Sequence, residues 1–451
     1  MYRKALLLLM ATAVCASLAS AQGTDEATSP LHITLEEAVQ LALKHNHMVR
    51  IAGYQIDQMQ HAKDVARSGY FPHVTNESTI VQLTDTQFIQ IGAGSLGTVA
   101  GTSIPAQSVT LNQGSHTVAT SGTGLVQPLT QLFTRVRPAN DAARADWNAS
   151  RANAKETENE VALKVHEIYY QILIAQLHRD ATQARIRADQ ALESERVQQV
   201  KFGSALEEQL IESKAQSLEA KQDLLTTDLS ISDLTMQLDD LMGMPVTMQL
   251  VLDTTVPPVA SSCDPDECVK TALASHPEIV AARAEVEKAS AGVKLAKADY
   301  IPDISAFARY SYASGVPFLA RNFGSFGAQL TFDLFDGGRR RAAVGESESE
   351  LAQAKENLAR VTDQVQLGVE TALNRLNRTK EMVDVSQQVL ALREESSRVT
   401  AQELLKGEAL PSQSDAAVAQ EFDAKTSLLQ SQLGYVQAED ELLQAMGITP
   451  Q

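Results

Sequence analysis

The sequence predicts a mainly α-helical protein made of two copies of one unit, each combining very long helices with a pair of β-strands. Three observations support this fold class, and the first is an internal repeat. Residues 35–72 align without a gap on residues 265–302, at an offset of 230. Residues 203–243 align in the same way on residues 407–447, at an offset of 204. Two copies of one long unit exclude most ordinary enzyme folds.

The second observation is the length of the helical pattern. Residues 139–200 and 340–404 are rich in Ala, Glu, Gln, Arg and Leu, and each would form a helix roughly 90 Å long. A coiled-coil seam runs along the first of them, with steps of four and three residues: Val161, Val165, Ile168, Ile172 and Ala175. Taken alone, such a helix favours a purely structural coiled coil.

Shorter helices are expected on either side of each long one. The opening helix should span residues 34–68 in the first copy and 266–299 in the second, and Thr34 and Glu37 have capping-box spacing. A return helix should follow at about residues 206–241. Two shorter helices stacked end to end would then match one continuous helix in length.

The third observation is a change of period after each opening helix. Pro72 and Pro302 end these helices, because proline lacks a backbone donor and disfavours helical geometry in the residue before it. Beyond Pro302, two runs alternate with period two, as strands with one apolar face do. Their apolar positions are Ile304, Ala306, Ala308, Tyr310 and Tyr312, then Phe326, Ala328, Leu330, Phe332 and Leu334. In the first copy, strands near residues 74–88 and 116–129 flank a Gly/Ser/Thr-rich stretch, 91–114, expected to be a long exposed loop.

The domain organisation follows from the repeat. We expect a signal peptide at 1–21, a first structural repeat at 22–262 and a second at 263–451. The first would hold barrel strands at about 72–132 and a helical hairpin at 138–242, and the second would hold strands at about 302–335 and a hairpin at 340–446.

The strand pairs require more than one chain. Four strands cannot close a barrel, and an apolar sheet face with open edges would aggregate. Three chains would supply twelve strands, enough for a trimeric 12-stranded transmembrane β-barrel. Nine of the 21 aromatic residues lie between Tyr300 and Phe335, so this region is the expected lipid-facing surface.

The N-terminus and the composition limit the location and the partners. Arg3 and Lys4, an apolar stretch at 5–16 and Ala19-Ser20-Ala21 are typical of a cleaved secretory signal, too short for a membrane anchor. The residues before Cys15 are a poor lipid-attachment signal. A formal net charge of −18 without a basic cluster argues against nucleic acid as a partner.

The mature cysteines and histidines indicate no catalytic chemistry. Cys263 and Cys268 are expected to form a disulfide, although two buried thiols are an alternative. His45 and His47 are a close pair with no carboxylate or cysteine set to complete a metal site. The glycines between 92 and 101 lack the strand-to-helix context of a phosphate loop. We therefore expect no enzyme, no cofactor and no metal.

These features together resemble the TolC-type outer membrane efflux channel family, over about residues 31–449. The residues that carry the resemblance occur twice and in order. They are the two openings LEEAVQLAL and PDECVKTAL, the Tyr-x-Pro entries at Tyr70 and Tyr300, Leu334-Phe335-Asp336-Gly337-Gly338, its weaker counterpart Gln127-Pro128-Leu129, and the glycines Gly203 and Gly407.

The resemblance implies a homotrimer in the outer membrane, with a long helical barrel in the periplasm. Its periplasmic end would be opened by a membrane-fusion adaptor joined to an inner-membrane pump. Export of small molecules such as drugs is the first hypothesis. Type I protein secretion or metal efflux is the alternative within the family, and a periplasmic coiled-coil adaptor is the alternative outside it.

The resemblance also assigns site residues. The helix–helix turns would contact the adaptor through Phe202, Gly203, Ser204, Lys406, Gly407 and Glu408, although plain hairpin turns would have the same sequence. Where relatives carry acidic rings at the pore entrance, this chain has Gln413 and Ala416, with Asp415 between them. Gln413 and Asp415 are therefore candidate gate residues, and Asp415 could equally be a solvated carboxylate. Arg196 and Arg398 are either closing salt bridges or exposed helix charges.

Overall fold

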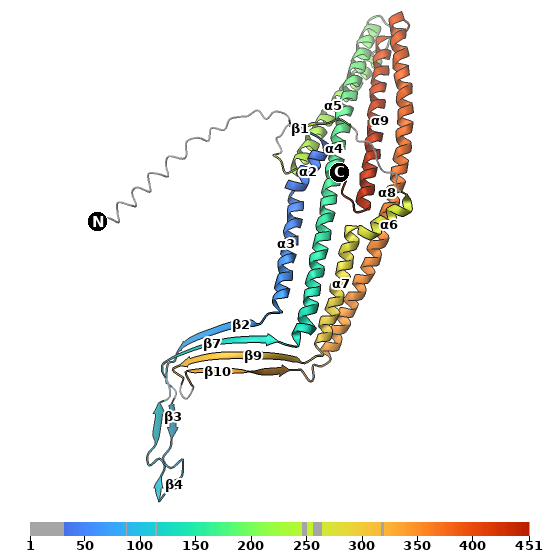
Figure 1. Cartoon of the computed structure of the whole chain (residues 1–451). Coiled ribbons are helices and arrows are strands. Elements are labelled where there is room, and N and C mark those ends of the chain that lie inside the picture. The colour runs from blue at the N-terminus through green and yellow to red at the C-terminus, as the bar shows by residue number, and fades with distance from the viewer. Residues whose placement is uncertain are drawn as a thin grey trace, which may run out of the picture. The chain divides into compact units, whose positions relative to one another are not determined.

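The computed structural model describes residues 31–86, 88–112, 115–245, 250–255, 264–316 and 320–450. Figure 1 shows the chain with its helices and strands labelled. The chain divides into two compact units, and each unit takes segments from both sequence repeats. Unit 1 consists of residues 1–46, 164–257 and 383–433, and unit 2 of residues 47–163, 258–382 and 434–451. The expected signal peptide, Cys15 and Cys263 lie outside the described residues.

Unit 2 contains an antiparallel sheet of four strands, two from each repeat. Its order is β10-β9-β7-β2, so the repeats meet at the β7–β9 pair in the middle. The strands are β2 (His73–Gln82), β7 (Thr117–Pro128), β9 (Asp303–Ser314) and β10 (Asn322–Thr331). The two outer strands, β2 and β10, are solvent-exposed along their entire length. Within the described residues, both edges of this sheet are therefore open.

The register of the sheet separates charged from uncharged side chains. Leu330 lies opposite Ile304 and Phe326 opposite Ala308, so the two apolar runs share one face, as the alternation predicts. Every charged or histidine side chain of the four strands lies on the other face: His73, Glu77, Asp303 and Arg309. One face of the sheet thus carries no charge.

The segment between β2 and β7 differs from the predicted loop. It contains two short antiparallel pairs, β3 (Phe88–Ile91) with β6 (Val109–Asn112) and β4 (Thr98–Val99) with β5 (Thr102–Ser103). The β4–β5 turn has positive φ at both central residues, 52° at Ala100 and 79° at Gly101. Such a turn matches the twist of a hairpin, so the glycines here make tight reversals between strands.

The helices of unit 2 are α3 (His47–Ser68), α6 (Pro265–Ser275) and α7 (Pro277–Ala298), together with parts of α4 (Arg137–Lys201), α8 (Arg339–Lys406) and α9 (Pro411–Ala445). The main apolar core lies between α6, α7, α8 and α9, and a separate small cluster joins α4 to α7. A short π-helix, η1 (Leu132–Val136), leads into α4. The core contains Cys268, Ala272, Ile279, Ala282, Val361, Val365, Val369, Ala372, Leu376, Ala438, Leu442 and Met446.

Unit 1 contains the distal parts of the long helices. β1 (Leu31–Ile33) pairs in parallel with β8 (Leu250–Leu252), beside α2 (Leu35–His45) and α5 (Glu207–Leu241). Tyr169 of α4 is buried and donates its hydroxyl proton to the Asp253 carbonyl oxygen at 2.9 Å. The predicted seam is buried at Val165, Ile168 and Ile172. No helix of the described residues is long and apolar enough to cross a membrane.

Each opening helix is broken, which the sequence did not predict. The helix expected at 34–68 is α2 followed by α3, and the helix expected at 266–299 is α6 followed by α7. In the second copy, Pro277 forces His276 into an extended conformation with ψ of 129°. In the first copy, Asn46 adopts the same conformation, and its side-chain amide donates to the Leu241 carbonyl oxygen at 3.0 Å. The predicted Thr34–Glu37 capping box is present.

The ends of the return helices lie against these breaks. A Cβ atom on Gly243, just after α5, would lie 2.9 Å from the Cβ atom of His45. A Cβ atom on Gly447, just after α9, would lie 2.7 Å from the Cδ atom of Pro277. Each return helix therefore ends directly against an opening helix pair, as the end-to-end arrangement predicts.

Candidate functional site

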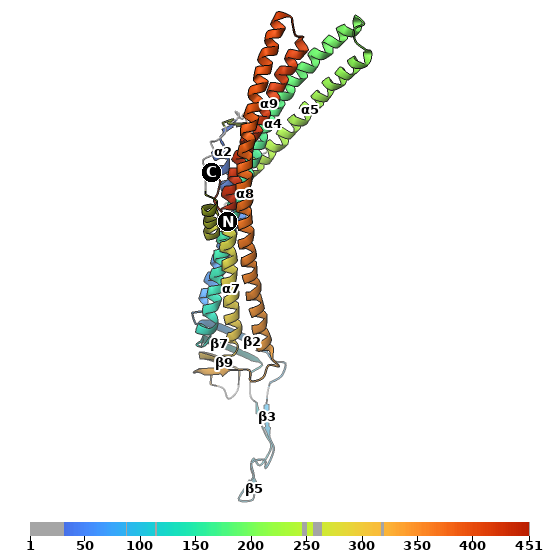
Figure 2. The same ribbon diagram turned by 90° about the vertical axis from the view of Figure 1, so that its right-hand side faces the viewer.

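The turns that join the long helices are the first candidate site, and both lie in unit 1 (Figure 2). After α4, the amide of Gly203 donates to the Val200 carbonyl and that of Ser204 to the Gln199 carbonyl. After α8, Gly407 and Glu408 make the same two bonds, to the carbonyls of Leu404 and Glu403. This is the Schellman arrangement, which requires a left-handed residue. Gly203 has φ of 71° and Gly407 of 77°, as expected for tip glycines.

The surface of both tips is apolar. Phe202 is 79% exposed and Leu405 is 89% exposed, on either side of the turns. Leu206 and Leu410, which precede α5 and α9, are also exposed. The sequence places Phe202, Leu206 and Leu410 in the two predicted turns, but sequence reasoning missed Leu405, although it stands two residues before Gly407. Exposed apolar groups at a helix turn are typical of a protein contact surface.

The remaining predicted tip residues are also at the surface. Lys406 and Glu408 are exposed beside Gly407. Ser204 is exposed, and its hydroxyl donates to the Gln199 carbonyl oxygen at 3.0 Å, so this side chain closes the turn.

Side-chain bonds between α4 and α5, between α4 and α9 and between α8 and α9 fix the order of the four helices in unit 1 as α5-α4-α9-α8. Thr182 of α4 donates to the Asp223 carboxylate of α5 at 3.2 Å. Arg393 of α8 donates to Gln420 of α9 at 2.8 Å. Figure 2 shows the same order, with the two hairpins side by side. The helices α5 and α8 are therefore the outer members of this set.

The inner helices α4 and α9 are joined close to the tips by Glu195. Its carboxylate accepts hydrogen bonds from the Ser412 amide at 2.9 Å and from the Ser412 hydroxyl at 2.6 Å. A carboxylate is stabilised there because the N-terminus of α9 carries partial positive charge. Sequence reasoning missed Glu195, since the 217 residues between the partners leave no local pattern.

The candidate gate residues lie in the first turns of α9, beside this contact. The Gln413 side chain accepts a hydrogen bond from the Leu410 amide at 3.0 Å, so it caps the helix start. Asp415 is half-buried. Arg398 pairs with Glu395 and Arg196 with Gln199, each within its own helix. The two arginines thus bridge no helices within the described residues.

Two aspartates in the same helix set have a raised carboxyl pKa. Burial raises the pKa of the Asp189 carboxyl, opposed by the charge of Arg185. Burial also raises the pKa of Asp423 on α9, and Arg185 and His178 of α4 partly offset that shift. Both carboxyls are thus partly withdrawn from solvent where α4 and α9 meet.

The outer helices each carry an exposed apolar seam. On α5 the seam steps by seven, seven, four and seven residues: Ile211, Leu218, Leu225, Leu229 and Met236. On α8 it steps by four, three and seven: Val385, Val389, Leu392 and Val399. These are coiled-coil spacings, yet within the described residues neither seam is covered. Two apolar seams on opposite outer helices indicate that further helices pack against them.

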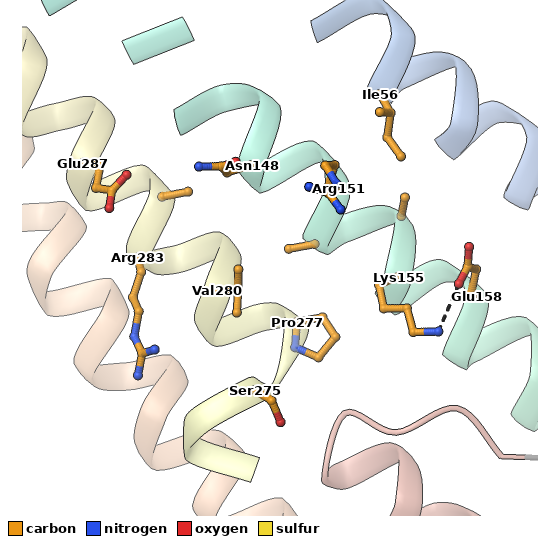
Figure 3. A pocket seen from close by; sticks show the side chains of 13 residues that line it. Ile56, Asn148, Arg151, Lys155, Glu158, Ser275, Pro277, Val280, Arg283 and Glu287 are labelled. Carbon is orange, nitrogen blue, oxygen red and sulfur yellow. Dashed lines mark hydrogen bonds and ion pairs between the residues drawn. The ribbon is translucent and has the colours of Figure 1, made fainter. Parts of the chain in front are cut away.

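A groove of about 700 Å³ lies in unit 2 between α3, α4 and α7 (Figure 3). Its lining mixes cations with small apolar residues, and Lys155 pairs with Glu158 at 3.1 Å. Ser275 at its edge donates its hydroxyl proton to the Thr271 carbonyl, away from any base. The described residues contain no group of three or more His, Cys, Asp or Glu suited to a metal ion.

Cys268 is fully buried in the core of unit 2 and is disulfide-bonded. Its expected partner, Cys263, lies outside the described residues, so this pairing stays a prediction.

Comparisons with known proteins agree with this geometry. Residues 268–448 match the family model described as outer membrane efflux protein. The outer membrane efflux protein BepC of Brucella suis is 28% identical over 130 residues, which are 28% of this chain and 28% of that protein.

Solved structures match over most of the length. A membrane protein from Pseudomonas aeruginosa has a TM-score of 0.74 at 18% identity, covering 92% of this chain and 90% of that one. The Campylobacter jejuni CmeC outer membrane channel also has a TM-score of 0.74, at 14% identity, covering 92% of this chain and 85% of that one.

The open four-stranded sheet, the long helices and the duplicated tips define the fold of a TolC-like outer membrane channel. The second part of the chain, residues 268–448, is similar in sequence to outer membrane efflux proteins. The family model, the Brucella suis relative and the Campylobacter jejuni structure are all described as outer membrane proteins or channels.

Proposed function

We propose that the protein is the outer membrane channel of a tripartite export system. Three copies would form a passive conduit from the periplasm to the exterior for small molecules such as drugs. A periplasmic adaptor coupled to an inner-membrane pump would open it, and the pump would supply the energy. The chain itself would catalyse no reaction.

The observation that carries this proposal is that the sheet and the helix set each have two uncovered sides. The sheet has a free edge at β2 and another at β10, and the helix set has an uncovered seam on α5 and another on α8. Pairing unlike edges head to tail generates a ring when the rotation closes. Four strands from each of three chains would give twelve, an even number within the range of outer-membrane barrels.

The uncharged face of the sheet supports lipid contact. Phe326 and Leu330 are exposed on that face, and the charged side chains lie on the other one. Charged residues destabilise a barrel wall when they face lipid but are tolerated when they face a lumen. The face with Arg309 and Glu77 would therefore line the channel.

The apolar tips support contact with an adaptor. Phe202 and Leu405 stand at the end of their hairpins, where no described part of the chain covers them. A partner helix pair would bury these groups, and buried aromatic anchors typically dominate such interfaces.

The proposal is tested by expressing variants in cells whose own copy is deleted. Deletion should sensitise the cells to dyes and antibiotics, and the wild-type chain should restore resistance. Phe202→Ser combined with Leu405→Ser should reach the outer membrane yet restore at least tenfold less resistance. Leu96→Ser with Val99→Ser is the matched control, because both residues are exposed and lie in the β4 region.

Two results would contradict the proposal. If the tip variant restored full resistance, the tips would not be the adaptor contact. If deletion left resistance unchanged but abolished export of a polypeptide or tolerance to a metal ion, the cargo would belong to type I secretion or metal efflux instead.

A further inference from the structure

The junction between the sheet and the helices of unit 2 contains a pocket that neither the conduit nor the tips explain. It has a volume of about 480 Å³ and lies where β7 leads through η1 into α4 and where α7 leads into β9. The Leu129 amide donates to the Ile304 carbonyl at 2.8 Å, and the Ile304 amide to the Thr130 hydroxyl at 3.0 Å. These bonds hold the two strand ends side by side, and the pocket forms next to them.

The lining of this pocket is basic in a strongly acidic chain. Three cationic residues line it, Arg137 from α4 and Lys294 and Lys297 from α7, against one acidic residue, Asp141. Lys297 already pairs with Glu348 at 2.9 Å. Arg137 and Lys294 are exposed, and neither makes an ion pair or hydrogen bond with any described residue. Two cations are thus available to an anion.

The same pocket has an apolar wall. Phe133 of η1 is 78% exposed, and Ile301, between α7 and β9, is also exposed. Beside the neighbouring strand end, Leu334 and Phe335 are exposed almost completely. An apolar rim beside free cations at the end of membrane strands is the arrangement that binds an acyl chain and a phosphate together.

We infer that this pocket binds an anionic phospholipid of the periplasmic leaflet, with the phosphate between Arg137 and Lys294 and an acyl chain along Phe133 and Ile301. The location of the junction indicates that the ligand of this pocket is a lipid. This inference rests on the proposed function, in which the strands lie in the outer membrane and the helices in the periplasm, so that the junction lies at headgroup level. A free phosphate ion would use the cations but would leave the apolar wall uncovered.

Native mass spectrometry of the assembled full-length channel tests this inference. Released from detergent with phosphatidylglycerol or phosphatidylcholine of identical acyl chains, the wild type should retain phosphatidylglycerol at least tenfold more strongly. Arg137→Gln combined with Lys294→Gln should weaken phosphatidylglycerol binding about 30-fold, since each cation near a headgroup contributes about 1 kcal/mol. Lys270→Gln with Lys380→Gln is the matched control, because both lysines are exposed on α6 and α8, and it should change nothing.

Several results would overturn the inference. Equal retention of the two lipids would show that charge plays no part. Equal weakening in both double variants would show a general effect of surface charge. Competition by inorganic phosphate at the lipid's own concentration would identify a phosphate-ion site. The intact mass in each spectrum reports assembly, and if the double variant does not assemble, each single variant should bind phosphatidylglycerol about fivefold more weakly. The mass-spectrometric measurement needs neither pump nor adaptor. Its result can therefore be read separately from the result of the efflux assay.

Discussion

At the scale of single residues, the structure shows four helix ends built alike but placed in different surroundings. The glycines Gly203, Gly243, Gly407 and Gly447 all have positive φ and all follow a long helix. Gly203 and Gly407 face open space, whereas Gly243 and Gly447 face the backbone of an opening helix pair. One local motif thus serves both as an exposed turn and as a close contact between elements.

Alanine substitution should separate these two roles. Gly407→Ala should destabilise by about 1 kcal/mol, the cost of a left-handed conformation for a residue with a Cβ atom. Gly447→Ala should cost about 3 kcal/mol, because its Cβ would also lie 2.9 Å from the Cα of His276. Thermal unfolding of both variants measures the difference. Equal midpoints would mean that the contact at Gly447 relaxes freely.

Asp239 of α5 is a second residue with an unusual position. It is completely buried, and neither of its carboxylate oxygens has a hydrogen-bond partner among the described residues. Burial raises the pKa of this carboxyl from 3.8 to about 6. The folded protein therefore binds more protons than the unfolded chain between these two values, so stability contributed by Asp239 is present below pH 3.8 and falls as the pH rises to about 6.

Asp239→Asn should therefore stabilise the protein at pH 7.5, where the wild type must bury a charge. The gain in thermal midpoint should shrink as the pH falls through 6 and vanish near pH 4. Asp228→Asn, at an exposed position of the same helix, provides the control. A gain that is independent of pH would contradict this account of the Asp239 charge.

At the scale of elements, the junction between β10 and α8 depends on one buried arginine. Arg340 is 8% exposed, donates to the Asp336 carboxylate at 2.7 Å and also donates to the Asp333 carbonyl oxygen. Its guanidinium lies over the rings of Phe332, at 4.9 Å, and Tyr300, at 5.7 Å. These contacts lower the pKa of Asp336 chiefly through the hydrogen bond from Arg340.

Arg340→Gln should destabilise this junction, because the planar, charged guanidinium group of Arg340 makes all these contacts at once. We expect its thermal midpoint to fall by about 4 °C more than that of Arg341→Gln. Arg341 is the matched control, since it is the next residue of α8 but is exposed and forms no ion pair within the described residues. Arg340→Lys should recover only part of the loss. Equal midpoints for the two glutamine variants would show that the junction does not depend on this contact.

The elements could be predicted from the sequence where the signal is local. Period-two alternation placed β9 and β10 and their shared apolar face, and the tip glycines placed the helix ends. The break at Asn46 could not be predicted, because it depends on a bond to Leu241, 195 residues away. The contact between Glu195 and Ser412 escaped prediction for the same reason. The break at Pro277 had a local signal, since the residue before a proline avoids helical geometry.

At the scale of the whole molecule, the uncovered seams on α5 and α8 make the assembly testable at one position. Leu225 lies 19 residues after the tip residue Leu206, and Val389 lies 17 residues before Lys406. The two side chains are therefore at nearly the same distance from the tips, since both helices rise by 1.5 Å per residue. A ring would bring Leu225 of one copy next to Val389 of the next.

Leu225→Cys combined with Val389→Cys should therefore form disulfides between copies, giving a covalent trimer on a non-reducing gel. Thr226→Cys with Val389→Cys is the matched control, because residue 226 is exposed at the same level but turned about 100° away from the seam. If the largest cross-linked species on the gel contained two or four copies, the threefold ring would be contradicted. Cross-linking of equal yield in the control would contradict the seam.

The hairpin extension between β2 and β7 has a practical consequence for cell-surface labelling. It leaves the sheet at the strand ends away from the helices, it carries no charged residue from Thr86 to Ser115, and it reverses at Ala100-Gly101. In the proposed channel, whose helices lie in the periplasm, that reversal would face the medium. An epitope inserted after Ala100 would be displayed to antibodies on intact bacteria, so one insertion could report both the orientation of the chain and its abundance.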